Sequence, residues 1–318
     1  MKLRIGSRGS QLALWQANHI AELLRIQKHE VEIEIIKTTG DRLQEVTFAE
    51  VGSKGMFTRE IEEALAESRI DLAVHSLKDL PTELPAGFAL AAAPPRVDPR
   101  DVFVSVNYAS LAELPRGARV GTSSQRRRAQ LKALRKDVEA VEFRGNVDTR
   151  LRKLTEGQVD AILLAAAGLD RLGKTDHVRE RLDPVDFCPA AGQGALGLEI
   201  RQGDVETLAA VNFLDHADTR FAVTAERAAL AALGGGCQVP IGIHCRPSFA
   251  QDIPSVSWWE IFGVVASPDS GRIIRVHLHA PRQNTDPTSL GRSAAEVLLA
   301  DGARELLSAG DGIAGGAA

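Results

Sequence analysis

"ARVGTSSQRRRAQL", residues 118–131, combines a short strand pattern with a turn and the start of a helix. The hydroxyl residues of the turn are typical helix N-caps, because their side chains accept hydrogen bonds from free backbone N–H groups. "LRIGSRGS", residues 3–10, has the same opening of Arg, an aliphatic residue, Gly and a hydroxyl residue. The two stretches therefore predict two strand-to-helix turns of one kind, one in each of two similar units.

The segments that follow these turns are also similar to each other. "ESRIDLAVHS" at 67–76 and "EGQVDAILLA" at 156–165 both resemble a helix end followed by a strand, with Asp in the same place. Strand and helix patterns alternate along this part of the chain, and "VEIEIIK" at 31–37 shows the period of two that a strand requires. This alternation predicts an α/β fold with mostly parallel, doubly wound sheets. We expect two lobes with a cleft between them, lined by the turns at the carboxyl ends of the strands.

A different pattern begins after about residue 215 and predicts a small α+β domain. Its expected elements are a helix that ends in a glycine run, two antiparallel strands and a closing helix, at 219–242, 258–267, 272–280 and 289–307. The Gly- and Ala-rich tail at 308–318 is expected to be disordered.

The composition excludes several classes of protein. The chain has 318 residues, a net charge of −4 and 4% aromatic residues, whereas nucleic-acid-binding proteins usually show a basic face and aromatic stacking platforms. No apolar run approaches the roughly 20 residues of a membrane span, and no signal peptide is recognised, so we expect a cytoplasmic protein. Cys188, Cys237 and Cys245 lack the spacing of a zinc site or a disulfide framework, and we expect no metal.

Arginines gather at the predicted strand ends. Arg126 and Arg127 lie at the start of a helix, where free N–H groups and the helix dipole attract anions. Others follow further strands, namely Arg8, Arg144, Arg150 and Arg171. Each one alone is more often a surface residue, but together they favour a cleft for a polyanion, since guanidinium groups bind carboxylate or phosphate with two hydrogen bonds. Neither a P-loop nor a G-x-G-x-x-G motif occurs, which disfavours a nucleotide.

Three other stretches carry candidate chemistry. "VHSLKDLP" at 74–81 places Lys78 and Asp79 beyond a buried strand, where a carboxylate can stabilise a cation or move a proton, although a surface ion pair is the alternative. Cys237 in "GGGCQVPIG" is either a nucleophile or covalent anchor, or an inert buried thiol. "AAGQGAL" at 190–196 suits a hinge, a backbone contact to a ligand or a plain interdomain turn.

Together these motifs resemble the porphobilinogen deaminase family, also called hydroxymethylbilane synthase. The similarity covers nearly the whole chain and includes, in order, "RIGSRGSQLALWQA", "VGSKGMFTREIEEAL", "DLAVHSLKDLPTELP", "DPRDVFVS", "GTSSQRRRAQL", "RGNVDTRLRKL", "AAAGLDRLG", "PAAGQGALGLE" and "GGGCQVPIG". Two departures occur: Gly234 stands where the family commonly has an acid, and the segment beyond Cys237 matches less closely.

The resemblance implies two lobes like those of periplasmic binding proteins, with the active site between them, and a C-terminal domain that carries a cofactor cysteine. The implied boundaries are 1–95 with 192–214, 96–191, and 215–318. It implies an enzyme that joins four porphobilinogens head to tail on a covalent dipyrromethane cofactor, releases ammonia at each addition and hydrolyses the product to hydroxymethylbilane. The implied partner is this substrate, and we expect no nucleic acid, no membrane and a monomer.

Matching positions imply a role for each candidate residue. Cys237 is the thioether anchor, Asp79 the catalytic aspartate, and Lys54 lies in a mobile lid. The residues implied to bind the cofactor are Lys78, Thr122, Ser123, Ser124, Arg126, Arg127, Arg144, Gly145 and Gln193. Those implied to bind substrate are Arg8, Ser10, Lys54, Arg150 and Arg171. The arginines then hold the acetate and propionate groups of the pyrroles, while Asp79 stabilises the positive species formed after ammonia is lost.

Two other classes of protein share parts of this pattern. A solute-binding module has two lobes and a charged cleft, but it needs neither a covalent anchor such as Cys237 nor Asp79. A DNA-binding regulator with similar lobes needs a helix-turn-helix segment, which the sequence does not show. The sequence therefore favours an enzyme.

Overall fold

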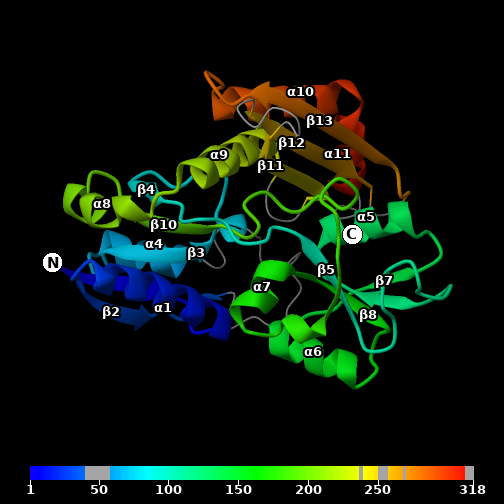
Figure 1. Ribbon diagram of the computed structural model, residues 1–318, viewed down its shortest axis with the longest axis horizontal. Coiled ribbons are helices and arrows are strands. Elements are labelled where there is room, and N and C mark those ends of the chain that lie inside the picture. Colours follow the sequence, from blue (N-terminus) through cyan, green and yellow to red (C-terminus); the bar gives the residue numbers. More distant parts are fainter. Residues whose placement is uncertain (40–57, 236–238, 250–256, 268–269, 312–318) are drawn as a thin grey trace, which may run out of the picture.

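The computed structural model describes residues 1–39, 58–235, 239–249, 257–267 and 270–311 (Figure 1). Their strands form three sheets, two with five strands and one with three. Figure 1 shows the two five-stranded sheets next to each other, with the three-stranded sheet and its helices at the top of the view. Within the described ranges, no helix is both long enough and apolar enough to span a membrane.

The first sheet has the strand order β2-β1-β3-β10-β4. β1 pairs in parallel with β2 and β3, whereas β10 is antiparallel to β3 and β4, so all strands except β10 run in one direction. The strands are β1 (Lys2–Ser7), β2 (Glu30–Ile35), β3 (Leu72–Ser76), β4 (Phe88–Ala92) and β10 (Leu196–Arg201). The helices are α1 (Gln11–Ile26), η1 (Leu77–Asp79), α4 (Arg59–Ala66), α8 (Val205–Val211) and η3 (Asn212–Leu214).

The second sheet repeats this arrangement with the order β7-β6-β8-β5-β9. β6 is parallel to β7 and β8, and β5 is the antiparallel strand. The strands are β5 (Asp101–Ser105), β6 (Arg119–Gly121), β7 (Glu139–Val141), β8 (Ala161–Ala165) and β9 (Val178–Arg181). The helices are α5 (Gln125–Leu134), α6 (Val147–Thr155), α7 (Ala166–Arg171) and η2 (Thr175–His177). β1 and β6 hold equivalent places, as do β3 and β8, which confirms the predicted α/β fold of two similar lobes.

Helices cover both faces of the first sheet, which explains why its central strands β3 and β10 are buried along nearly their whole length. α1 packs through Ile20 and Leu24 into the core that contains Val74 of β3. α4 packs through Ile61 into a separate core that contains Ala73. Neighbouring residues of a strand point to opposite faces, so these two cores lie on opposite sides of the sheet. The sheet is therefore doubly wound, as predicted.

The C-terminal domain contains an antiparallel sheet of order β11-β12-β13. Its elements are α9 (Ala217–Ala232), β11 (Ile241–Phe249), β12 (Ser257–Ala266), β13 (Ile273–Pro281), α10 (Pro287–Ala300) and α11 (Ala303–Asp311). α9 and α10 pack on one face of the sheet, where their alanines and leucines share a core with Ile243, Ile261 and Val276. The predicted helix before the glycine run and the two predicted antiparallel strands are confirmed.

Three expectations for this domain are wrong. The predicted closing helix is divided into α10 and α11 at Gly302, whose φ of 96° is the left-handed conformation that ends helices. The tail predicted to be disordered begins too early, because α11 continues to Asp311, while 312–318 lie outside the described residues. The expectation of two strands is incomplete, because β11 forms a third strand at the edge of the sheet, where Pro247 is tolerated.

Glu226 of α9 joins three segments where the sheets meet. Its buried carboxylate accepts hydrogen bonds from Arg96 Nη1 at 2.5 Å, from the Gly192 N–H at 2.7 Å and from the Cys245 N–H at 2.7 Å. Arg96 lies on the crossing from β4 to β5, and Gly192 lies on the return crossing from β9 to β10. One carboxylate therefore fastens both crossings between the lobes to the C-terminal domain.

We expect Glu226→Ala to lower the free energy of unfolding by about 3–5 kcal/mol, because it leaves the Arg96 guanidinium buried and unpaired. Chemical denaturation monitored by circular dichroism measures the change. Glu296→Ala, an exposed position on α10, is the matched control and should shift stability by no more than about 0.5 kcal/mol. Equal stability of the two variants would contradict the role assigned to Glu226.

Candidate active site

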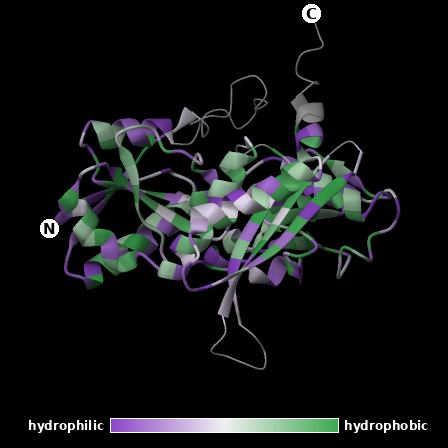
Figure 2. Cartoon of the chain, turned by 90° about the horizontal axis from the view of Figure 1, so that it is seen from above, coloured by the Kyte–Doolittle hydropathy of each residue, from purple (hydrophilic) through white to green (hydrophobic). Residues whose placement is uncertain are grey.

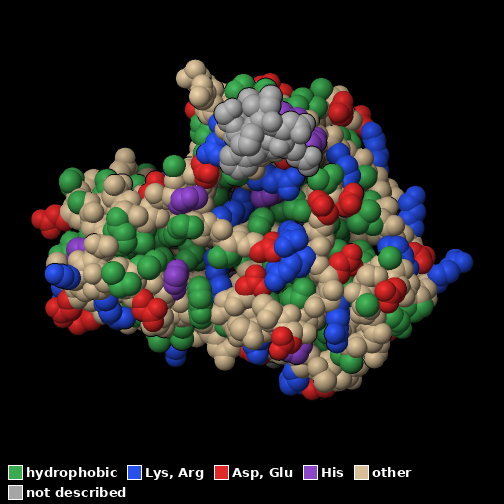
Figure 3. Space-filling model, in the orientation of Figure 1, with side chains coloured by type: hydrophobic (Ala, Val, Ile, Leu, Met, Phe, Trp, Pro, Cys, Tyr) green, Lys and Arg blue, Asp and Glu red, His purple; other side chains and the backbone are tan. Residues whose placement is uncertain are grey.

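A cavity of about 1160 Å³ lies between the two lobes. Its walls come from the β1–α1 turn, the end of β3, the β7–α6 turn, the β8–α7 join and the 190–196 loop. The first four follow the carboxyl ends of parallel strands, which is where ligands bind in open α/β sheets, and the 190–196 loop leads into the antiparallel strand β10. Figure 3 shows Lys and Arg side chains near the middle of the face that is drawn.

Three helices begin at or next to the cavity. Ser10, Ser124 and Asn146 cap α1, α5 and α6, and their side chains accept hydrogen bonds from backbone N–H groups three residues ahead at 3.3, 3.4 and 2.8 Å. Gly145, before the last cap, has a φ of 125°, and a Cβ there would lie 2.7 Å from Thr149 Cγ2. The helix start predicted within residues 118–131 is thus confirmed. The positive ends of these helix dipoles favour an anion.

Basic side chains dominate the cavity lining. They are Arg8, Lys37, Lys78, Arg127, Arg144, Arg150, Arg152 and Arg171, while Asp79 and Asp148 are the acids among the described lining residues. Arg150 Nε donates to the Gly145 carbonyl at 2.8 Å, and Arg171 Nη2 donates to the Gly194 carbonyl at 2.9 Å. Burial lowers the pKa of both guanidinium groups to about 10. A bound anion would relieve this cost, since an opposite charge favours the charged form.

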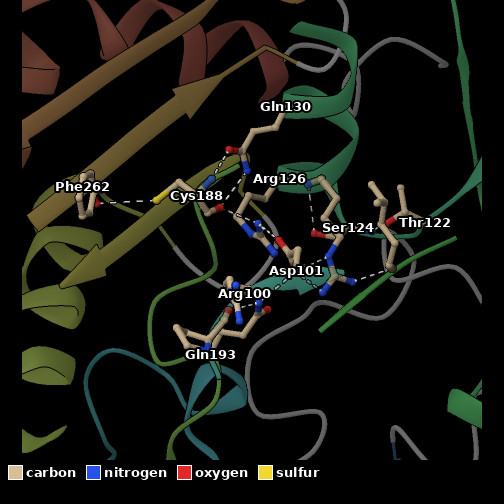
Figure 4. A network of polar contacts seen from close by, with 12 residues as sticks. Arg100, Asp101, Thr122, Ser124, Arg126, Gln130, Cys188, Gln193 and Phe262 are labelled. Atoms are coloured by element: carbon tan, nitrogen blue, oxygen red, sulfur yellow. Dashed lines mark hydrogen bonds and ion pairs between the residues drawn. The ribbon is translucent and has the colours of Figure 1, made fainter. Parts of the chain in front are cut away.

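The start of the α5 helix is held by a carboxylate that the sequence reasoning missed. Asp101 accepts hydrogen bonds from Arg126 Nη1 at 2.6 Å, Arg127 Nη2 at 2.7 Å and Gln193 Nε2 at 3.0 Å (Figure 4). Burial alone would raise the pKa of Asp101, but the two guanidinium groups hold it well below its usual range. The sequence does contain a sign of this interaction, because Asp101 is the first residue of the apolar strand "DVFVS". A carboxylate in a buried strand needs a charged or hydrogen-bonding partner.

Lys78 and Asp79 both line the cavity, directly after β3. The pKa of Lys78 is lowered to about 8, mainly by burial; Asp79 opposes this shift, and the charge of Arg127 adds to it. The loop that contains Gly192 packs against this turn so closely that a Cβ at Gly192 would lie 3.1 Å from Lys78 N. The "AAGQGAL" loop therefore forms the wall behind Lys78 and Asp79.

The structure brings most of the predicted site residues to one cavity. Those that line it are Arg8, Ser10, Lys78, Asp79, Ser123, Arg127, Arg144, Gly145, Arg150, Arg171 and Gln193. Thr122, Ser124 and Arg126 lie behind the wall and support it, since Arg126 is held by Asp101 and by the Cys188 carbonyl at 2.7 Å. Lys54 and Cys237 lie outside the described residues.

The other two cysteines are poor nucleophiles. Cys188 and Cys245 are buried, each with an exposed fraction of 1%. Burial raises the pKa of the Cys188 thiol to about 12 and raises that of Cys245 above its usual range. A thiolate is the reactive form, so neither side chain suits covalent attachment.

The fold and the site define an α/β protein with a basic cleft suited to an anionic ligand. Residues 3–209 match the family model "Porphobilinogen deaminase, dipyromethane cofactor binding domain", and residues 220–300 match its C-terminal domain. The chain belongs to the porphobilinogen deaminase family.

Curated relatives are similar in sequence to this chain over nearly its whole length. Porphobilinogen deaminase from Geobacter sulfurreducens is 50% identical over 96% of this chain and 94% of that protein. The enzyme of the same name from Bordetella parapertussis is 47% identical over 96% of both chains. Among solved structures, the methionine-binding protein MetQ is 13% identical with a TM-score of 0.44, over 69% of this chain and 91% of that one.

The donor groups of the cavity fit the cofactor named by the family model. A dipyrromethane with acetate and propionate groups offers carboxylates to the guanidinium groups and helix starts, and pyrrole N–H groups to acceptors. Gln193 Oε1 is such an acceptor, since it is buried and has no hydrogen-bond partner among the described residues. Arg127, Arg144, Arg150 and Gln193 would hold the group.

We expect Lys78 to titrate with a midpoint near pH 8 in Cys237→Ser protein, in which no ligand is tethered to raise its pKa. Asp79→Asn, added to this variant, should move the midpoint lower, because it removes a negative charge that favours the ammonium. The pH dependence of acetylation at Lys78, followed by peptide mass spectrometry, measures both values. Exposed Lys136 is the internal control and should respond alike in both proteins. A midpoint near 10.5 that ignores Asp79→Asn would refute the burial argument.

Proposed function

We propose that the cleft performs the reaction of the porphobilinogen deaminase family. Four porphobilinogen molecules are joined head to tail on a covalent dipyrromethane primer, with ammonia released at each addition, and hydrolysis then frees hydroxymethylbilane for tetrapyrrole and heme biosynthesis. The observation that carries this proposal is the buried basic cleft with Asp79 in its wall, in a chain that is 50% identical to a curated porphobilinogen deaminase over 96% of its length.

Cys237 is the proposed point of thioether attachment. The family match supplies this role, and the structure supports it by elimination, because burial makes Cys188 and Cys245 unreactive. When bound, the dipyrromethane supplies the pyrrole carbon to which the first porphobilinogen is joined. The chain itself supplies the tether, the anion-binding groups and one carboxylate.

The carboxylates of the cofactor and substrate are assigned to the basic lining. Arginines from both lobes line the cavity, namely Arg8, Arg144, Arg150 and Arg171. A chain of pyrroles can therefore be bound along its length. Arg127 contributes directly from the wall, and Arg126 contributes its charge from one layer behind. Ser10, Ser123 and the helix starts capped by Ser124 and Asn146 complete the anion-binding surface.

Asp79 is the proposed catalytic residue. Positive charge develops on a pyrrole nitrogen when ammonia leaves, and again on the attacking pyrrole before it loses its proton. A carboxylate stabilises both charges and can accept the proton, whereas the surrounding guanidinium groups would oppose them. Asp148, the other acid among the described lining residues, is engaged by Lys174 at 2.6 Å. Asp79 is therefore the carboxylate best placed for this task.

The remaining assignments also belong to this proposal. The domains comprise residues 1–95 with 192–214, 96–191, and 215–318, and Lys54 is assigned to substrate binding by its match to the family. The enzyme acts as a monomer in the cytoplasm. Sedimentation of the purified protein tests the oligomeric state, and fractionation of cells tests the location.

We expect Asp79→Asn to lower kcat for porphobilinogen consumption by about 10²–10⁴-fold, the usual contribution of a positioned acid–base group. The fold and the covalent two-pyrrole adduct should remain, because the amide has the same shape and Asp79 is not an anchor. Absorbance assay of the product measures the rate, and intact-mass spectrometry checks the adduct.

Asp176→Asn removes an equal charge from an exposed site on η2 and is the matched control, with an expected rate close to that of the unaltered enzyme. A near-normal rate for Asp79→Asn would refute the assigned role. Loss of the adduct together with the rate would instead assign Asp79 to cofactor assembly.

A further inference from the structure

The face of the C-terminal sheet opposite α9 and α10 carries three potential metal ligands. Hydrophobic and hydrophilic residues alternate along β13 (Figure 2). On β12, the face that carries Glu260 also carries Phe262 and Val264, which are buried in a core with Ala129 of α5. The hydrophobic set, which includes Ile261 and Val276, faces the core beneath α9 and α10. Glu260 of β12 and His277 and His279 of β13 alternate with that set and therefore lie on the opposite face. None of the three lines the cleft between the lobes.

The antiparallel pairing of β12 with β13 brings these three residues together. Glu260 is directly opposite His279, and His277 is two residues before it on the same face of β13. Glu260 Oε1 lies 3.7 Å from His279 Nδ1. One ligand atom from each of the three residues lies within 4.8 Å of the others. Such a set is not visible in the sequence, because Glu260 is distant from the histidines along the chain.

Neighbouring side chains restrict the three groups. The His277 ring stacks on Phe262, with centroids 4.2 Å apart, and its centroid is 4.3 Å from that of His279. Arg246 Nε donates to Glu260 Oε2 at 2.9 Å. This contact orients the carboxylate while Oε1 remains directed toward His279. A carboxylate or imidazole fixed by such outer contacts binds a metal with less loss of freedom.

The protonation states of the cluster also suit a metal. Burial and the neighbouring His279 lower the pKa of His277, so its imidazole is neutral at pH 7. Burial would raise the pKa of Glu260, but the hydrogen bond from Arg246 keeps it below its usual value. Neutral imidazole and ionised carboxylate are the forms that coordinate metals.

We propose that Glu260, His277 and His279 form a binding site for a divalent transition-metal ion of the Zn²⁺ class. Two imidazoles and one carboxylate suit Zn²⁺, Ni²⁺ or Cu²⁺, whereas Mg²⁺ and Ca²⁺ prefer oxygen ligands. Zn²⁺ bonds of about 2.0–2.2 Å place ligand atoms roughly 3.4 Å apart, so side-chain rotations that close the group by about 1.5 Å complete the site. Water occupies the fourth position, because both histidines are exposed.

Titration calorimetry of the chelator-treated full-length holoenzyme with Zn²⁺, after removal of any affinity tag, tests this proposal. We expect one equivalent to bind per chain at pH 7 and to be removed again by excess chelator. His279→Ala and Glu260→Gln should each weaken binding by about tenfold or more. His279 is 51% exposed, so its replacement leaves the core of the sheet intact.

His177→Ala, at an exposed site on η2, is the control and should bind Zn²⁺ as the unaltered protein does. Circular dichroism verifies that each variant is folded. Absence of saturable Zn²⁺ binding would overturn the proposal. Equal binding by the His279→Ala and His177→Ala proteins would also overturn it, because the ion would then occupy another site.

Discussion

Asp101 lies buried at the start of β5 and accepts hydrogen bonds from Arg126, Arg127 and Gln193. One carboxylate can neutralise only one of two guanidinium groups, so this pair leaves positive charge at the cleft wall. The same interaction holds the start of α5 and the 190–196 loop in place. The cleft is thereby built before any ligand arrives, and a bound polycarboxylate completes a charge balance that the chain leaves open.

The crossings between the lobes extend this constraint to the whole molecule. Gln193 and Gly192 lie on the return crossing, and Gly192 donates to Glu226 of the C-terminal domain at 2.7 Å. Arg96 on the other crossing contacts both Glu226 and the Gln193 carbonyl, the latter at 2.7 Å. The C-terminal domain is therefore anchored to the loop that forms the cleft wall.

Local patterns predicted the features that depend on neighbouring residues in the chain. The repeated strand-to-helix turns and the position of the arginines beyond the strand ends were predicted correctly, because capping chemistry and strand periodicity depend on neighbouring residues. Asp101 and Glu226 were missed, since their partners come from distant segments. β11 was not among the expected strands, and the break at Gly302 was missed because the apolar pattern of the closing segment continues across it. The sequence therefore identified the charged residues of the cleft, but not the buried carboxylates that hold the surrounding segments in place.

The central claim is that a thiol-tethered chain of pyrrole acids fills the basic cleft. Intact-mass spectrometry of the purified protein and of Cys237→Ser tests it most directly. The account predicts that the unaltered protein exceeds its encoded mass by one two-pyrrole adduct, and that the variant shows the encoded mass alone. Unaltered protein with only its encoded mass after incubation with porphobilinogen, or an adduct that persists in Cys237→Ser, would contradict it.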